Sequence, residues 1–187
     1  LYNSGQFEEV LSRAKLLISL FSSTLSLLNI KGASEVALER YNVAIDSYRQ
    51  VLKINPNYAE AYYNIGICLH KLGLLDPAID KYRQAIKIKP VNADSYNNIG
   101  LCFEDKGDLD AAIVNYRHAV SIAPNYIEGH YNIGNTLNKM GEHEAAIESY
   151  RQALKINPNY AEAYNNLGSV LTNKEEFDLA IENYEQA

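Results

Sequence analysis

The most constraining feature of this sequence is a unit of 34 residues that repeats without insertion. Residues 59–92 form one copy, residues 93–126 and 127–160 form the next two, and residues 161–187 begin a fourth. A fixed period of this length indicates a helical solenoid, in which each short unit buries its apolar faces against its neighbours. The chain is therefore predicted to be all-α, with a core that runs as a continuous strip along the array.

The same residue types return at the same positions of each copy, counted from its first residue as position 1. Positions 4, 7, 8 and 11 share one face of a first helix, and positions 20, 24 and 27 share one face of a second. Glycine at position 8 and alanine at position 20 let two helices approach closely, and tyrosine at position 24 fills the remaining space. Proline at position 32 ends the second helix. In the copy at 59–92 these residues are Tyr62, Ile65, Gly66, Leu69, Ala78, Tyr82, Ala85 and Pro90.

This set of residues closely resembles the tetratricopeptide repeat, and residues 115–134 are most similar to the repeats of the O-GlcNAc transferase superhelix. The resemblance implies antiparallel helix pairs that stack into a right-handed α–α superhelix. A single array is expected to span residues 1–187. It would comprise a partial repeat at 1–24, full repeats at 25–58, 59–92, 93–126 and 127–160, and a truncated repeat at 161–187.

The first helix of the unit at 25–58 departs from this pattern, because Lys31 takes position 7 and Glu35 takes position 11. Burying an unpaired charge is expensive. Either the helix rotates so that Ile30 and Val36 face inward, or the two charges face a partner. The rotation is the favoured interpretation.

Helix ends are also marked in the sequence. Ser22 stands where the repeat has its proline. Ser23 or Thr24 is expected to cap the helix that follows. An N-x-x-E sequence before three first helices predicts capping boxes at Asn57–Glu60, Asn125–Glu128 and Asn159–Glu162. A left-handed turn between helices is predicted at Gly73, Gly107 and Gly141. Glu175 stands where the last unit should have its glycine, so that turn is expected to differ.

Composition limits the possible partners and compartment. The formal net charge of −6 argues against nucleic acid or an anionic membrane surface as a partner. Residues 13–31 are mostly apolar after a basic flank, but they are too short to span a bilayer and follow the repeat register, which argues against a targeting segment or anchor. Cys68 and Cys102 both take position 10 and are interpreted as buried thiols in a reducing compartment, which predicts a cytoplasmic protein.

No pattern for catalysis or for a cofactor appears in the sequence. The four histidines share no helix face or metal-ligand spacing. His130 replaces the aromatic residue of position 4 and is expected to be a packed, hydrogen-bonded histidine. The chain is therefore predicted not to be an enzyme by itself and to hold neither a metal nor a cofactor.

What remains is a surface. The resemblance implies that the first helices line a concave face, to which positions 2, 5, 6, 9, 12 and 13 contribute. Asparagine at position 6 offers donors and an acceptor that can pair with the main chain of an extended peptide, and tyrosines beside it add apolar contact. The candidate peptide-binding residues are Asn64, Asn98, Asn132, Asn166, Tyr63, Asn97, Tyr131, Asn165 and Asn135. The alternative is that asparagine at position 6 belongs to the repeat itself and has no role in binding.

Two further features of this face bear on the ligand. An acidic residue at position 2 could favour a basic peptide, but it also favours the helix dipole, and the second interpretation is preferred. The Lys or Arg with which chaperone-binding relatives hold a carboxylate at positions 2, 5 and 6 is absent.

The sequence thus predicts an interaction scaffold that binds an extended or helical segment of another protein. One alternative is the substrate-recruiting region of a larger enzyme such as a glycosyltransferase. Another is end-to-end self-association through the last helix, on whose receiving face Leu179, Ala180 and Tyr184 are expected to lie.

Overall fold

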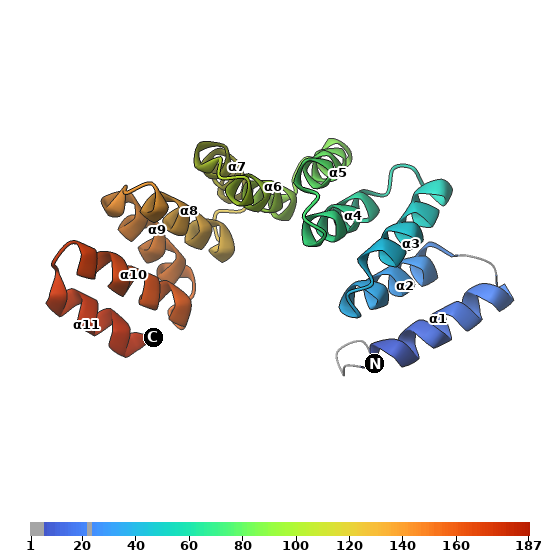
Figure 1. The fold of residues 1–187 in the computed structure, drawn as a ribbon, viewed down its shortest axis with the longest axis horizontal. Coiled ribbons are helices and arrows are strands. Elements are labelled where there is room, and N and C mark those ends of the chain that lie inside the picture. The colour runs from blue at the N-terminus through green and yellow to red at the C-terminus, as the bar shows by residue number, and fades with distance from the viewer. Residues whose placement is uncertain (1–5, 22–23) are drawn as a thin grey trace. The chain divides into compact units, whose positions relative to one another are not determined.

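The computed structural model describes residues 6–21 and 24–187, and every regular element within these ranges is an α-helix (Figure 1). This confirms the predicted all-α solenoid. Successive first helices from α4 onward begin 34 residues apart. The helices are α1 (Phe7–Phe21), α2 (Leu25–Ala37), α3 (Tyr41–Ile54), α4 (Ala59–Lys71), α5 (Leu75–Ile88), α6 (Ala93–Asp105), α7 (Leu109–Ile122), α8 (Ile127–Lys139), α9 (His143–Ile156), α10 (Ala161–Asn173) and α11 (Phe177–Gln186).

The chain divides into two compact units after Pro90. The N-terminal unit contains α1 to α5 and has a core built around Leu28, Tyr48 and Ile65. The C-terminal unit contains α6 to α11, with Tyr116, Ile133 and Tyr150 in its core. Within each unit, helices that are consecutive in sequence pack against one another.

The predicted contact between glycine and tyrosine holds each helix pair together. A Cβ atom added at Gly66 would lie 2.5 Å from Cε1 of Tyr82, and one added at Gly134 would lie 2.7 Å from Cε1 of Tyr150. Real Cβ atoms do not approach other atoms so closely, so these positions require glycine unless the ring moves. The tyrosine rings at this position in α3, α5, α7 and α9 are at most 1% exposed.

Helix α2 does not rotate, so the favoured interpretation of its two charges was wrong. Ile30 is 42% exposed, whereas the Glu35 side chain is 1% exposed. The Glu35 carboxylate lies 2.9 Å from Nζ of Lys31 and accepts a 2.6 Å hydrogen bond from Oγ of Ser47 on α3. The Lys31 ammonium also donates to the same Ser47 oxygen. Helix α2 therefore keeps the repeat register because its charges pair with each other inside the unit.

The turns between paired helices are left-handed, as predicted at the three glycines, with φ between 73° and 80°. Glu175 has φ 62° and Glu39 has φ 57°, so the turn at Glu175 keeps the glycine conformation instead of differing. Its hydrogen bonds match those at Gly141: the N–H of Glu175 donates to O of Thr172, and the next N–H donates to O of Leu171. The fold thus imposes the same turn on a residue with a side chain.

Replacing Glu175 with glycine is expected to raise the free energy of unfolding by about 1 kcal/mol, because glycine adopts the left-handed conformation without a Cβ clash. Urea unfolding followed by circular dichroism measures the change. Gly141→Ala is the matched control in the opposite sense and should lower the stability by a similar amount. An unchanged midpoint for both variants would show that these turns carry no strain.

The predicted capping boxes are absent. The N-cap residues of α4, α8 and α10 are Tyr58, Tyr126 and Tyr160, and none makes a side-chain capping bond. The asparagine of each N-x-x-E sequence lies one residue too early to cap. Side-chain capping occurs instead at Asn92, Asp108 and Thr24, each of which accepts a hydrogen bond from the backbone N–H three residues later. The capping role of Thr24 was predicted, whereas Ser22, Ser23 and the first five residues lie outside the described part of the chain.

Residues 13–31 fall on α1 and α2 where they are described. None of the described helices combines the length and the apolar character that a bilayer crossing needs.

Neither Cys68 nor Cys102 forms a disulfide, and both thiols are buried, as predicted. Burial raises the pKa of the Cys68 thiol from 9.0 to about 11. Burial likewise raises the pKa of Tyr116 and Tyr150 above the ordinary value. All three groups therefore hold their protons more tightly in the folded state than in the unfolded state.

The free energy of unfolding is expected to fall as the pH rises from about 9 to about 11, because the unfolded thiol loses its proton before the folded one does. The Cys68 thiol contributes about 1.4 kcal/mol per pH unit within this window, and Tyr116 and Tyr150 add to the loss only above their ordinary pKa of 10.0. Urea midpoints at about pH 8 and about pH 10 measure the effect, and Cys68→Ala should reduce the difference between them. An equally large pH dependence in that variant would exclude Cys68 as a source.

Candidate functional site

The asparagines at position 6 link successive first helices within the C-terminal unit. Nδ2 of Asn132 on α8 donates a 2.9 Å hydrogen bond to Oδ1 of Asn97 on α6. Nδ2 of Asn166 on α10 donates a 2.9 Å hydrogen bond to the hydroxyl of Tyr131 on α8. In both cases position 6 of one repeat is bonded to position 5 of the preceding repeat. The column of amides therefore stabilises the stacking of the repeats, a contact that sequence reasoning did not foresee.

Asn135 joins three helices of this unit. Its Oδ1 atom accepts hydrogen bonds from Nδ2 of Asn166 at 2.9 Å and from the hydroxyl of Tyr150 at 2.8 Å. The Tyr131 ring lies beside it, with its centroid 5.0 Å from that of Tyr160 and 6.0 Å from that of Tyr150. Burial, together with the neighbouring Tyr131 and nearby carboxylates, raises the pKa of Tyr160 to about 12. The result is a fixed cluster of amides and phenols on the first-helix face of α8 and α10.

The other predicted residues differ in exposure. Asn97 is buried, Asn165 is exposed, and the remaining asparagines and tyrosines of the set are half-buried. In the N-terminal unit the Tyr63 ring packs 5.8 Å from that of Tyr82. Asn64 borders a small hollow together with Val36 and Tyr48. Hydrogen bonds thus connect predicted residues in two places, Asn97 with Asn132 and Asn166 with Tyr131 and Asn135.

A hollow of about 250 Å³ opens next to this cluster. Its lining comes from α8, α9 and the middle of α10. The residues that form it are Asn135, Asn138, Lys139, Tyr150, Asn166 and Ser169. The candidate set contained only two of the six. Asn138, Lys139 and Ser169 hold positions 12, 13 and 9, which the repeat places on the same face, so the sequence carried a signal for them.

Several polar atoms around the hollow already have partners. Both hydrogens of Asn166 Nδ2 are donated, to Tyr131 and to Asn135. Oδ1 of Asn138 is bonded to the His143 ring at 3.1 Å. The Lys139 ammonium is paired with Glu104, a carboxylate that also accepts a 2.7 Å hydrogen bond from the Tyr116 hydroxyl. The groups left for a ligand are the side-chain N–H donors of Asn135 and Asn138, the Asn166 carbonyl oxygen and the Ser169 hydroxyl.

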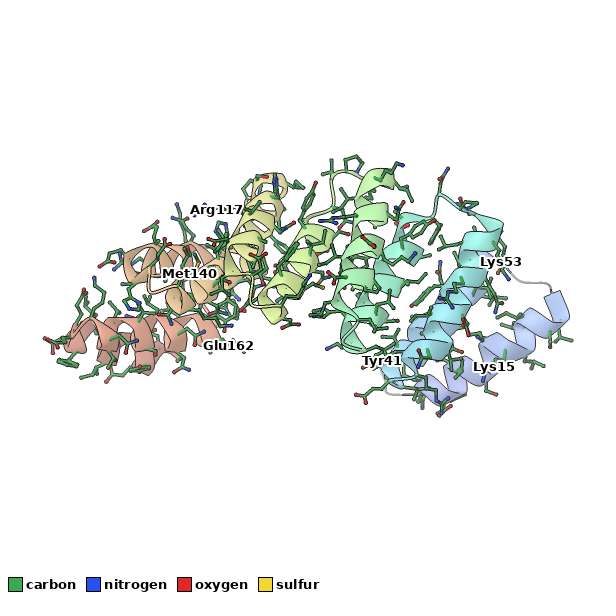
Figure 2. The ribbon with its side chains drawn as sticks, turned by 45° about the horizontal axis from the view of Figure 1, so that its top comes forward. Lys15, Tyr41, Lys53, Arg117, Met140 and Glu162 are labelled. Carbon is green, nitrogen blue, oxygen red and sulfur yellow. The ribbon has the colours of Figure 1, made fainter. Side chains whose placement is uncertain are left out.

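The acidic residues at position 2 are exposed and lie in the first turns of their helices. Glu162 on α10 is labelled in Figure 2. Asp94 accepts a 3.0 Å hydrogen bond from the hydroxyl of Tyr126. Carboxylates in a first turn interact favourably with the helix dipole, which agrees with the preferred interpretation of this column.

The histidines of the described residues are dispersed. His130 is half-buried and bonded through Nε2 to the backbone oxygen of Pro124 at 2.9 Å, close to the expectation of a hydrogen-bonded histidine. The His118 ring stacks on Tyr96 at 5.3 Å. No group of three or more metal-ligating side chains lies together in residues 6–21 and 24–187.

The fold and its repeated helix pairs define a class of protein, the α-helical repeat solenoids. Profiles of one family within that class match most of the chain: a TPR repeat profile matches residues 32–73, 102–141 and 134–174, and a tetratricopeptide repeat profile matches residues 59–92. The chain belongs to the tetratricopeptide repeat family. No curated protein sequence matches it.

Solved structures of similar fold agree with this assignment. The crystal structure of MamA shares 26% identity at a TM-score of 0.74, covering 83% of this chain and 91% of that one. YrrB, described as a TPR protein with an unusual peptide-binding site, shares 19% identity at a TM-score of 0.68, covering 92% and 89%. PilF of Pseudomonas aeruginosa shares 20% identity at a TM-score of 0.80, and the match covers 87% of this chain and 74% of that one. These neighbours share the fold, and membership of the tetratricopeptide repeat family supports a role as a protein-interaction scaffold.

Proposed function

We propose that this chain is a non-enzymatic scaffold that binds an extended or helical segment of another protein along the first-helix face of its repeats. The observation that supports this most is the hollow beside Asn135 and Asn166, where polar groups remain available for a ligand. Its walls are held in place by hydrogen bonds between three helices. Such prior ordering reduces the entropy that is lost on binding.

The available groups suit the main chain of a peptide. The N–H donors of Asn135 and Asn138 can bond a carbonyl oxygen, and the carbonyl oxygen of Asn166 can accept from a backbone N–H. The Lys139 charge is balanced by Glu104, so the hollow offers no unpaired cation that would select a carboxylate. Binding at this point would therefore depend little on the side chains of the partner.

Peptide-library capture tests the proposal with the whole chain. The double variant Asn138→Ala and Ser169→Ala removes ligand-facing groups and leaves the bonds of Asn135 and Asn166 intact. Asn115→Ala with Ser149→Ala is the matched control on α7 and α9, where both side chains bond only to their own helix. Loss of captured peptides in the first variant alone supports the proposal. Equal capture by both variants, or no capture by the unmodified chain, contradicts it.

The alternative is a larger enzyme that recruits its substrates through this array; it rests on the sequence resemblance to O-GlcNAc transferase repeats alone, and none of the matches reported above adds to it. The scaffold role is the same in both cases. The full length of the native polypeptide distinguishes them, because a catalytic domain would add several hundred residues.

Self-association is a second candidate, favoured by the apolar face of α11. Ile181 is 56% exposed and Tyr184 is 43% exposed, whereas the equivalent Ile147 and Tyr150 of α9 are covered by α10. Leu179 is also exposed, but Ala180 is buried against its own unit, so only part of the expected receiving face is open. A molar mass that rises with concentration, and falls on Leu179→Glu with Ile181→Glu, supports a second copy as the occupant; Tyr184 is left unchanged because its ring packs against Gly168. A strict monomer contradicts it.

A further inference from the structure

Another hollow, of about 390 Å³, lies in the N-terminal unit, apart from the small one beside Asn64. It is bounded by the turn between α3 and α4, by the start of α4 and by the last turns of α5. Its lining residues are Pro56, Asn57, Tyr62, Gln84, Lys87 and Ile88. Tyr62 is at position 4 of its repeat and Gln84 at position 26, so neither belongs to the peptide-binding face described above.

The next repeat shows what fits against an aromatic ring at this position. In the C-terminal unit, Tyr96 holds position 4 and His118 holds position 26. Their rings stack with centroids 5.3 Å apart and an interplanar angle of 30°. The N-terminal unit has the same helix pair and the same tyrosine, but glutamine replaces the histidine. The His118 ring occupies the space beside Tyr96. At the equivalent place beside Tyr62, Gln84 supplies no ring.

The charges around the hollow indicate the character of the ligand. The Lys87 side chain lines it, and Nζ of Lys81 lies 5.8 Å from the centroid of the Tyr62 ring. Ile88 and Pro56 add apolar surface. No acidic side chain is among the lining residues. In a ligand that has a ring next to a carboxylate, the ring could stack on Tyr62 and the carboxylate could pair with the lysine ammonium groups.

We propose that this hollow binds an aromatic side chain from an acidic segment of a partner protein, with the ring stacked on Tyr62 and a neighbouring carboxylate paired with Lys87. The site is separate from the hollow of the C-terminal unit. The two binding proposals are therefore independent, and failure of one would not contradict the other.

The internal repeat supplies the decisive variant. Gln84→His should place an imidazole against Tyr62, as His118 stacks on Tyr96, and so block the ligand. Because Gln84 is exposed, the change should leave the core intact. The reverse substitution, His118→Gln, is the matched control: it alters the equivalent position of the C-terminal unit and should leave the hollow beside Tyr62 unchanged.

Binding is measured by fluorescence anisotropy with a labelled short peptide that carries one phenylalanine between aspartates. A second peptide has leucine in place of the phenylalanine, and a third has asparagine in place of the aspartates. The unmodified chain should prefer the first peptide over each of the others by about tenfold, and Gln84→His should weaken its binding by a similar factor. Raising the salt concentration should weaken the first peptide more than the third.

Three results would overturn the proposal. They are failure of the first peptide to bind, equal binding of the leucine peptide, and unchanged affinity in Gln84→His. Circular dichroism and the urea midpoint of Gln84→His show whether lost binding reflects a filled hollow or an unfolded chain. If that variant were unstable, Lys87→Gln would test the carboxylate contact alone and should lower affinity for the first peptide without affecting the third.

Discussion

Replacing Tyr116 with alanine is expected to lower the free energy of unfolding by about 4 kcal/mol. The Tyr116 side chain is fully buried, lies against Gly100 and donates a hydrogen bond to Glu104. Alanine would leave a cavity and deprive the Glu104 carboxylate of that donor. Urea unfolding followed by circular dichroism measures the loss.

The partner glycine gives a stricter test of the same contact. A Cβ atom at Gly100 would lie 2.5 Å from Cε1 of Tyr116, so Gly100→Ala should cost about 3 kcal/mol by itself. In the Tyr116→Ala background the clash is absent, and the same change should cost less than about 1 kcal/mol. Gly107→Ala is the control, because no atom lies within 4 Å of a Cβ there and only the φ of 80° is unfavourable. Additive effects of the Gly100 and Tyr116 changes would refute the packing explanation.

Replacing Glu35 with alanine is expected to lower the free energy of unfolding by about 3 kcal/mol. The change leaves the Lys31 ammonium, whose side chain is 17% exposed, without its carboxylate, and it removes the shorter of the two hydrogen bonds that the Ser47 hydroxyl donates. Breaking a buried ion pair at one end typically costs 3–5 kcal/mol. The partial exposure of Lys31 places the expected loss at the lower end of that range.

Removing both charges should have the opposite result. Lys31→Ile with Glu35→Leu restores the residues that Ile65 and Leu69 provide at the same positions of the next repeat. The double variant should be at least as stable as the unmodified chain, because two apolar side chains replace an ion pair whose burial is offset by desolvation. The single variant Glu35→Leu should remain destabilised. If the double variant were as unstable as that single variant, α2 would need the pair for packing and not for charge balance.

The two sets of variants test one contact that follows the 34-residue repeat and one ion pair that departs from it. The Gly100–Tyr116 contact follows from the period, because residues that recur at fixed spacing must occupy equivalent places in every repeat. The Lys31–Glu35 pair breaks the period, and sequence reasoning resolved the conflict by rotating the helix. The actual solution needed Ser47, a residue of the opposite helix whose proximity no spacing within α2 could reveal.

Helix starts show the same limit at shorter range. The N-x-x-E sequences have the composition of capping boxes, yet the helices begin two residues after the asparagine, and Asn55 and Asn157 accept from backbone N–H groups of the turns instead. Which residue becomes the N-cap depends on where the preceding helix ends and how the chain reverses. That geometry is set by packing between the two helices.

For the candidate site, the sequence predicted the first-helix face and two of the six residues that line the hollow there, Asn135 and Asn166. It predicted that asparagine and tyrosine would gather along the first helices, and Tyr131, Asn135 and Asn166 do so. It left open whether the amides would serve a ligand or the repeats themselves. The spacing between α8 and α10 brings Asn166 within hydrogen-bond distance of Tyr131 and Asn135, which commits its donors internally and leaves its acceptor available.

The sequence by itself determined the repeat, the helix pairs and the small-to-large contacts of their interior, because these depend on a periodicity that is visible in one dimension. The tertiary structure alone decided how the exceptions are accommodated. Whether Lys31 is buried, whether Glu175 adopts a left-handed turn, and which amide atoms face a hollow all depend on side chains brought close by packing. Those distances depend on how two or more helices pack, so they cannot be read from any single position in the sequence.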